Sequence, residues 1–378
     1  MIEKLIEYRR ALHKIPEISF NEYKTSAFIK NELSNLGLEY KEVAKTGIVS
    51  FIKGESDFTI AFRADIDGLA ITESNDIDFK SEHEGFMHAC GHDFHMALLL
   101  GIAFYYKKNK APCNILLIFQ PAEEGGAGAL KMLDEDVLRI FKFPDLIFGL
   151  HVNPEYNYDQ IAFTKGIAWA GSCEFEIEFI CKGGHGALPH TSEDLLFIFS
   201  QFYFSIQAML SRKKDIKDMA LLTIGKLKGF DIPNVLTNKA ISTGTFRFFS
   251  EKIYKFLSCS ICSILDGLKL MYNFNYLYKE KSLYIPVINN EKVSDNLLKL
   301  ISSEKNLGFN ILSSPTVMIS DDFGYFLDKI PGIYFFLGVK SKENQKLHTS
   351  NFDPDEKALE NGFNLYKYLI ENYNKLLR

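Results

Sequence analysis

Four short apolar runs in the first half of the chain restrict its fold more than any other feature. They cover residues 48–52, 59–63, 114–120 and 146–150. Because they are short and largely apolar without strict alternation, they are typical of strands buried within a sheet. Stretches with helical spacing accompany them, beginning with 3–14 and 21–36. This alternation of elements predicts an α/β architecture.

Carboxylates and a histidine follow three of these runs. Asp65 and Asp67 come after the second run, Glu123 and Glu124 after the third, and His151 after the fourth. Open α/β sheets bind ligands beyond the carboxyl ends of their strands, so we expect these groups to meet at one edge. Two adjacent carboxylates point in different directions, which lets one bind a metal while the other transfers protons. A solvated acidic turn and a structural strand-end histidine are the alternatives.

A thiol and three imidazoles lie within the eight residues 88–95. Cys90 and His92 are two residues apart on a predicted turn, where a thiolate and a neutral imidazole can face one divalent ion. Gly91 between them removes the Cβ that would obstruct the ion. The alternative is a helix start with incidental histidines. His348 is a further candidate after a polar loop, and the joint occurrence of these groups favours a metal centre.

The pattern of elements changes near residue 171. After it, half-solvated strands alternate with two long helical stretches, 192–211 and 251–270. This pattern predicts an inserted α+β unit over roughly 172–286, between two parts of the main domain, 1–171 and 287–378.

Composition and charge exclude several classes of partner. A net charge of −5 and a pI near 6.0 give no basic surface for nucleic acid. The N-terminus lacks the pattern of a signal peptide and no apolar run is long enough to span a bilayer, so we expect a cytoplasmic protein without a membrane partner. The six cysteines lack disulfide spacing and are expected to be reduced, with Cys259 and Cys262 buried in a helix.

Eight segments of the chain together resemble the M20 metallopeptidase family. They are residues 63–69, 87–95, 120–126, 149–152, 183–190, 244–247, 320–323 and 347–349. Within that family they are similar to the aminoacylase-type amidohydrolase branch, which includes hippurate hydrolases, auxin-conjugate hydrolases and N-acetyldiaminopimelate deacetylases. The resemblance implies a two-metal catalytic domain with a central mixed sheet flanked by helices, at 1–171 and 287–378. It also implies that the insert at 172–286 is a ferredoxin-like α+β lid and dimerisation domain.

The same resemblance implies a role for each candidate residue. The implied metal ligands are Cys90, His92, Glu124, His151 and His348. The implied catalytic residues are Glu123 as the base that shuttles protons, Asp65 as the acid that orients a ligand or the metal-bound water, and His185 of the insert as an oxyanion stabiliser. Asn234 and Arg247 match positions that contact the substrate carboxylate or the lid backbone. Asp321 departs from the family, which usually has Glu there, so the contact made by that Glu is not implied.

The implied reaction is hydrolysis of the amide bond of an N-acyl amino acid. Zinc suits a thiolate and imidazoles, while manganese and cobalt are alternatives for two sites that include a carboxylate. Residues 87–96 and 353–358 resemble the N-acetyldiaminopimelate deacetylases of lysine biosynthesis, so N-acetyl-L,L-diaminopimelate is the favoured substrate. Hippurate and other N-acyl amino acids are the enzymatic alternatives, and a catalytically silent relative that binds a metabolite or a partner is the rival from another class. We expect a homodimer through the lid domain.

Overall fold

The computed structural model describes residues 1–304, 307–342 and 345–377. The chain divides into two compact units. Unit 1 comprises Met1–Ala168, Val287–Thr316 and Asp322–Arg378, and unit 2 comprises Trp169–Pro286 and Val317–Asp321. The short segment Val317–Asp321 belongs to unit 2 although it lies far along the chain, a grouping that the sequence pattern does not reveal.

The centre of unit 1 is a mixed sheet with the strand order β1-β2-β4-β3-β5-β16-β6-β15. Its strands are β1 (Tyr40–Val43), β2 (Gly47–Ile52), β3 (Thr59–Asp65), β4 (Asn114–Gln120), β5 (Leu146–Asn157), β6 (Gln160–Phe163), β15 (Asn310–Ser313) and β16 (Gly332–Lys340). The strands β4, β3, β5 and β16 run parallel, while β1, β2 and β6 have antiparallel neighbours. The four apolar runs form β2, β3, β4 and the first part of β5, which confirms the predicted α/β fold with a mixed sheet.

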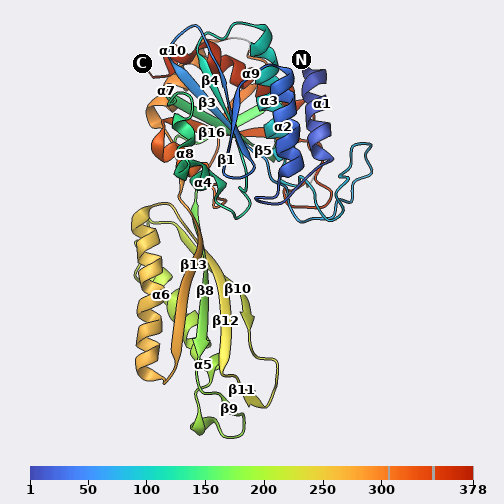
Figure 1. Cartoon of the computed structure of the whole chain (residues 1–378). Coiled ribbons are helices and arrows are strands. Elements are labelled where there is room, and N and C mark those ends of the chain that lie inside the picture. The colour runs from blue at the N-terminus through green and yellow to red at the C-terminus, as the bar shows by residue number, and fades with distance from the viewer. Residues whose placement is uncertain (305–306, 343–344, 378) are drawn as a thin grey trace. The chain divides into compact units, whose positions relative to one another are not determined.

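Helices cover this sheet. They are α1 (Ile2–His13), α2 (Tyr23–Asn35), α3 (His92–Lys108), α4 (Gly128–Asp134), α7 (Glu291–Ser303), α8 (Gly324–Lys329), α9 (Ala358–Glu371) and α10 (Tyr373–Leu376). Figure 1 shows α1, α2 and α3 grouped along one side of the sheet, and α3 packs against β3, α1 and α9. Every residue of β3 and β4 is buried, because both faces of these strands are covered.

Unit 2 is built from a four-stranded antiparallel sheet in the order β10-β12-β8-β13 and two helices. Its elements are β8 (Gly171–Ile180), α5 (Leu195–Arg212), β10 (Ala220–Lys228), β12 (Lys239–Phe248), α6 (Glu251–Met271) and β13 (Asn275–Tyr284), with the short strands β9 (Gly184–His185) and β11 (Val235–Leu236) paired beside them. A further short pair, β7 (Gly166–Trp169) with β14 (Val287–Asn289), belongs to unit 1 except for Trp169. The order of strands and helices is that of a split βαβ, ferredoxin-like unit.

Alternation of buried and more exposed side chains along β8 explains how the helices pack on one face of this sheet. Cys173, Phe175 and Ile177 are buried in the cluster that contains the inner faces of α5 and α6, while the intervening glutamates lie on the opposite face. In α6 the buried stripe recurs at helical spacing and includes Ile261 but not Cys259, which is exposed. The expectation that Cys259 is buried is therefore wrong, because it lies off that stripe.

Candidate metal centre

The strand-end groups of unit 1 meet at one edge of its sheet. Asp65 is the last residue of β3, and Glu123 and Glu124 follow the end of β4. The strands β4 and β5 both pair with β3 in parallel, which brings their corresponding ends together. His151 lies within β5, which continues to Asn157, so the expectation that this strand ends before the histidine is wrong.

The structure brings the five predicted metal ligands together. Their ligand atoms form overlapping groups in which all atoms lie within 4.8 Å of one another. The groups are Cys90 with His92 and His151, Cys90 with Glu124 and His348, and His92 with Glu123 and Glu124. Cys90 is common to the first two groups. Two clusters of potential ligands thus share one sulfur atom.

Cys90 is the centre of this arrangement. Its Sγ lies 3.3 Å from Nε2 of His151 and 3.2 Å from Nε2 of His348. The same His348 nitrogen lies 3.2 Å from Oε1 of Glu124. Burial, followed by the charges of Glu124 and Glu123, raises the pKa of the Cys90 thiol well above its usual value. A bound divalent cation would reverse this effect, since a coordinating thiol is deprotonated.

Gly91 shapes the turn that carries the thiol. It has a φ of +78°, a conformation that residues with a Cβ rarely adopt. A Cβ at this position would lie 2.4 Å from Cγ2 of Val152. The glycine is therefore needed for its backbone conformation and for close packing on β5. This reason differs from the predicted one, which was clearance for an ion.

His92 gives the clearest sign that the site fits a cation. Its Nδ1 donates a hydrogen bond to the backbone oxygen of Asp67 at 2.8 Å, so Nε2 is the nitrogen available to a metal. Among the described residues, His92 Nε2 is a buried atom without a hydrogen-bond partner, and it stays 3.6 Å from the Asp65 carboxylate. Buried polar atoms normally have partners, and a cation is a group that this nitrogen and the nearby carboxylates fit.

His151 is oriented in a similar way. Its Nδ1 donates to the backbone oxygen of Val152 at 2.8 Å, so Nε2 is the nitrogen that faces Cys90. Burial, followed by the nearby His95, holds the pKa of His151 well below its usual value. A neutral imidazole with a fixed tautomer is the form that binds a metal.

His95 is a residue of the site to which the sequence analysis gave no role. Its Nδ1 donates to Oδ1 of Asp65 at 2.5 Å, and its Nε2 accepts the backbone N–H of Val152 at 3.1 Å. Asp65 also accepts a hydrogen bond from Nη1 of Arg63 at 2.7 Å. The three-residue spacing from His92 puts His95 on the same face of α3 and is the signal that identifies it.

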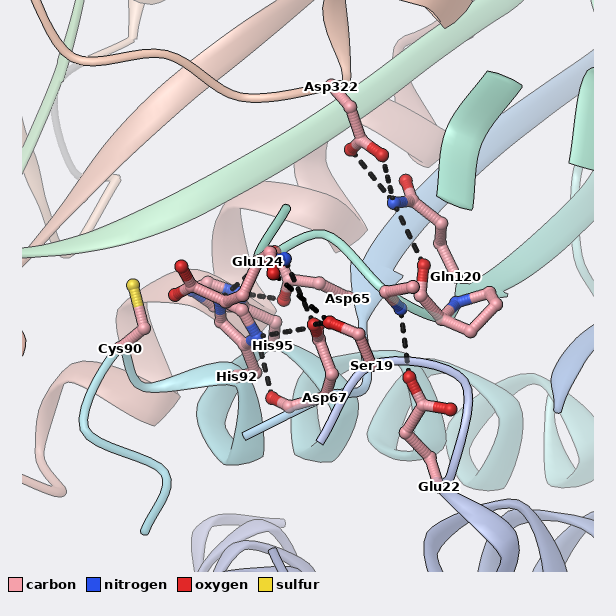
Figure 2. Close-up of polar contacts among 12 residues, drawn as sticks. Ser19, Glu22, Asp65, Asp67, Cys90, His92, His95, Gln120, Glu124 and Asp322 are labelled. Carbon is pink, nitrogen blue, oxygen red and sulfur yellow. Dashed lines mark hydrogen bonds and ion pairs between the residues drawn. The ribbon is translucent and has the colours of Figure 1, made fainter. Parts of the chain in front are cut away.

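The turn after β4 places two carboxylates beside the imidazoles. Glu123 is 7% exposed, and its carboxylate lies within 4.8 Å of the ligand atoms of His92 and Glu124. The backbone N–H of Glu124 donates to Oδ2 of Asp67 at 3.0 Å, and the hydroxyl of Ser19 donates to the same oxygen at 2.9 Å. Figure 2 shows the contacts that join Asp67 to His92, Glu124 and Ser19.

A second buried network lies behind this turn. Asp322 accepts hydrogen bonds from Nη2 of Arg63 at 2.9 Å and from Nε2 of Gln120 at 2.8 Å. Nε of Arg63 donates to Oε1 of Gln120 at 2.7 Å, so the three side chains form a closed set. The segment 320–323 was identified in the sequence only by resemblance, and nothing in its spacing predicts that Asp322 binds Arg63 and Gln120. The network fixes the end of β4 from which Glu123 and Glu124 project.

The remaining predicted site residues lie in unit 2. His185, in β9, is exposed, and its Nδ1 accepts the backbone N–H of Ala187 at 3.1 Å. The backbone oxygen of Asn234 accepts the N–H of Gly186 at 2.8 Å. Arg247, in β12, donates to the hydroxyl of Ser320, which also belongs to unit 2. The roles of His185, Asn234 and Arg247 in catalysis or substrate binding stay predictions.

Comparison with known proteins identifies the family. The model of peptidase family M20/M25/M40 matches residues 61–372. The N-acetyldiaminopimelate deacetylase of Priestia megaterium is 37% identical over 372 residues, which cover 98% of this chain and 98% of that protein. The chain belongs to peptidase family M20/M25/M40. The resemblance found in the eight segments is confirmed, and this M20 protein is a metal-dependent hydrolase of amide bonds.

Solved structures agree with this family. A dinuclear metal-binding peptidase of the M20 family from Bacillus subtilis has a TM-score of 0.83 and 28% identity, with 99% of both chains covered. An aminobenzoyl-glutamate utilization protein from Klebsiella pneumoniae has a TM-score of 0.72 at 17% identity and covers 98% of this chain and 95% of its own. The second likeness shows the fold alone. Among the described residues, no helix is long and apolar enough to cross a membrane.

Proposed function

We propose that this M20 protein removes the acetyl group from N-acetyl-L,L-diaminopimelate, a step of lysine biosynthesis that would occur in the cytoplasm. The observation that carries the proposal is the convergence of five candidate metal ligands, of which Cys90 is shared by two groups, with the Glu123 carboxylate beside them. The relative of Priestia megaterium, similar over 98% of both chains, supports the choice of substrate.

Two divalent cations would be held by the two groups that share Cys90. One group combines the thiolate with His92 and His151, and the other combines it with Glu124 and His348. Thiolate and imidazole ligands favour zinc, and one carboxylate in the set leaves manganese and cobalt as alternatives. When bound, such ions polarise the amide carbonyl and lower the pKa of the attacking water.

Glu123 is the proposed proton shuttle. Its carboxylate is buried beside the ligands but is not needed in either group that contains Cys90. It accepts a proton from the attacking water and later delivers this proton to the departing nitrogen, so that acetate and the free amino acid leave. Asp65 acts through His95. Its carboxylate accepts the hydrogen bond of His95 Nδ1, and His95 Nε2 accepts the backbone N–H of Val152, the residue next to His151.

Unit 2 is the proposed lid and dimerisation domain. Its His185 would donate a hydrogen bond to the oxyanion that forms on the substrate, while Asn234 and Arg247 would contact the substrate carboxylate or the lid backbone. The exposure of His185 supports this assignment, because a histidine that serves a partner subunit must be accessible on its own. The assembly that follows is a homodimer.

A comparison of substrates tests the proposal. Zinc-loaded protein is assayed with N-acetyl-L,L-diaminopimelate, hippurate and N-acetyl-methionine. We expect kcat/KM to be higher for the diaminopimelate derivative by about tenfold or more. A preference for hippurate would make the protein a hippurate hydrolase. Inactivity towards all three substrates, with metal bound, would instead favour the catalytically silent relative.

A further inference from the structure

Glu22 is a buried carboxylate that the proposed mechanism does not use. Its Oε1 accepts the backbone N–H of Phe20 and the backbone N–H of Ala122, each at 2.9 Å. Its Oε2 accepts the hydroxyl of Thr46 at 2.6 Å. Figure 2 shows the carboxylate directed at the backbone that follows Gln120. One side chain thus joins three segments that lie far apart in the sequence.

Two of the groups that Glu22 binds belong to strained backbone. Ala122 has a φ of +54° and Phe20 a φ of +59°, in the left-handed region that residues with a Cβ rarely adopt. Ala122 is fully buried, so without Glu22 its N–H would lose its partner inside the protein. The carboxylate therefore stabilises a conformation that the alanine does not prefer.

The turn has little room to relax on its other side. The N–H of Gly128 donates to the backbone oxygen of Ala122 at 3.1 Å. A Cβ at Gly126 would lie 2.5 Å from Cβ of Ala122, and a Cβ at Gly128 would lie 1.7 Å from the oxygen of Pro121. The chain folds back closely on Ala122, so a change in its conformation would shift the whole turn.

This turn carries the two carboxylates of the site. Glu123 and Glu124 follow Ala122 directly, and the direction of their side chains depends on its φ and ψ. Asp67 holds the far end through the N–H of Glu124. Glu22 holds the near end through the N–H of Ala122. Both ends of the turn are thus fixed by carboxylates that come from other segments.

We propose that Glu22 is a positioning residue, which holds Ala122 in its left-handed conformation so that Glu123 and Glu124 face the metal centre. Glu22 acts through the backbone, by accepting the N–H of Ala122. The inference rests on the proposed function, since that function makes Glu123 the proton shuttle and Glu124 a metal ligand.

The main test is Glu22→Ala, with zinc affinity measured by competition with a chelating dye. Misplacing Glu124 should weaken zinc binding by roughly 10- to 100-fold, the usual cost of losing a group that orients a ligand. In the zinc-saturated variant, misplacing Glu123 should lower kcat for N-acetyl-diaminopimelate while KM stays nearly constant. Zinc affinity and kcat equal to those of the wild type would overturn the inference.

Glu17→Ala is the matched control. The Glu17 carboxylate also accepts backbone N–H groups, those of Lys24 at 2.8 Å and Thr25 at 3.0 Å, at the start of α2. It has no side-chain hydrogen bond to the turn of Ala122 among the described residues. Its loss should lower the melting temperature but leave zinc affinity unchanged. Equal losses of zinc affinity in both variants would show that Glu22 supports the fold in general, and would refute a positioning role.

Two further variants test the backbone mechanism. Adding Ala122→Gly to Glu22→Ala should restore most of the zinc affinity, because glycine adopts a positive φ without the steric cost of a Cβ. Glu22→Gln keeps an acceptor oxygen and should retain most of the affinity. If the double variant binds zinc no better than Glu22→Ala, the left-handed conformation of Ala122 is not what Glu22 provides.

Glu22→Asp replaces Glu22→Ala if the alanine variant does not fold. The shorter aspartate side chain cannot reach all the partners of Glu22, so we expect a loss of roughly tenfold in zinc affinity. Wild-type affinity in Glu22→Asp would then overturn the inference.

Wild-type protein that binds zinc but hydrolyses none of the three substrates would refute the proposed function, while the zinc measurements would still decide the role of Glu22.

Discussion

The candidate groups of unit 1 and those of unit 2 differ in how the fold holds them. In unit 1, Asp65, His92 and Glu123 are buried and are fixed by the ends of parallel strands and by the start of α3. In unit 2, His185 and Asn234 are exposed on a short strand pair and beside it. A buried group has its environment supplied by its own chain, whereas an exposed group faces solvent unless a substrate or another subunit covers it. The comparison predicts different behaviour when each kind of residue is changed.

The largest effect is expected in unit 1, for Glu123→Gln. The variant should bind zinc like the wild type but lose activity by roughly 10²–10⁴-fold, because an amide cannot accept the proton of the attacking water. Metal content by atomic emission and kcat for N-acetyl-diaminopimelate measure the two properties. Near-normal turnover would remove Glu123 from the proposed mechanism and leave the buried cluster without a base.

A somewhat smaller effect is expected in unit 2, for His185→Ala. Losing one oxyanion donor should lower kcat by roughly 10²–10³-fold and change KM less. If His185 serves the partner subunit, mixing this variant with Glu123→Gln should create heterodimers with one intact site and up to about half of the wild-type activity. A mixture with proven subunit exchange that stays inactive would contradict the role across the dimer.

His95→Ala tests whether groups behind the ligands matter in unit 1. Removing the imidazole leaves the Asp65 carboxylate and the N–H of Val152 without this partner, so zinc affinity should fall by about 10- to 100-fold. His83→Ala is the control, because His83 donates to the backbone oxygen of Pro16 outside the metal centre. Equal zinc affinity in both variants would show that His95 does not orient the ligands.

The smallest effect concerns thiol reactivity and leaves function unchanged. Cys259 of unit 2 is exposed and should react readily with iodoacetamide at pH 8. Burial raises the pKa of Cys113 in unit 1 to about 12, so its thiolate fraction at pH 8 is on the order of 10⁻⁴. Mass spectrometry after brief labelling should find Cys259 modified and Cys113 unmodified. Rapid labelling of Cys113 in folded protein would contradict its described burial.

The sequence predicts the sheet of unit 1 and the meeting of its polar residues for a physical reason. Buried parallel strands are nearly continuous apolar runs, and their carboxyl ends lie at one edge, so Asp65, Glu123 and His151 could be expected to meet. Local spacing also identified Cys90 and His92 as a pair. These signals lie within short segments of the sequence and consist of residue types that bind metals or transfer protons.

The supporting contacts could not be predicted in the same way. Glu22 binds Ala122 across about a hundred positions, and Asp322 binds Arg63 across more than two hundred, so no local pattern connects them. The positive φ values at Ala122 and Phe20 could not be predicted from the sequence either, since these residue types rarely adopt them. Such contacts become visible only when the topology brings distant segments together.

The assignment of Val317–Asp321 to unit 2 has a practical consequence for dissecting the protein. A fragment of residues 169–286 would lack Val317, which forms a bridge with Trp169, and Ser320, which accepts a hydrogen bond from Arg247. A transplant of this unit into another scaffold must therefore carry two separate stretches of chain. Transferring it as a single continuous stretch would remove both of these contacts.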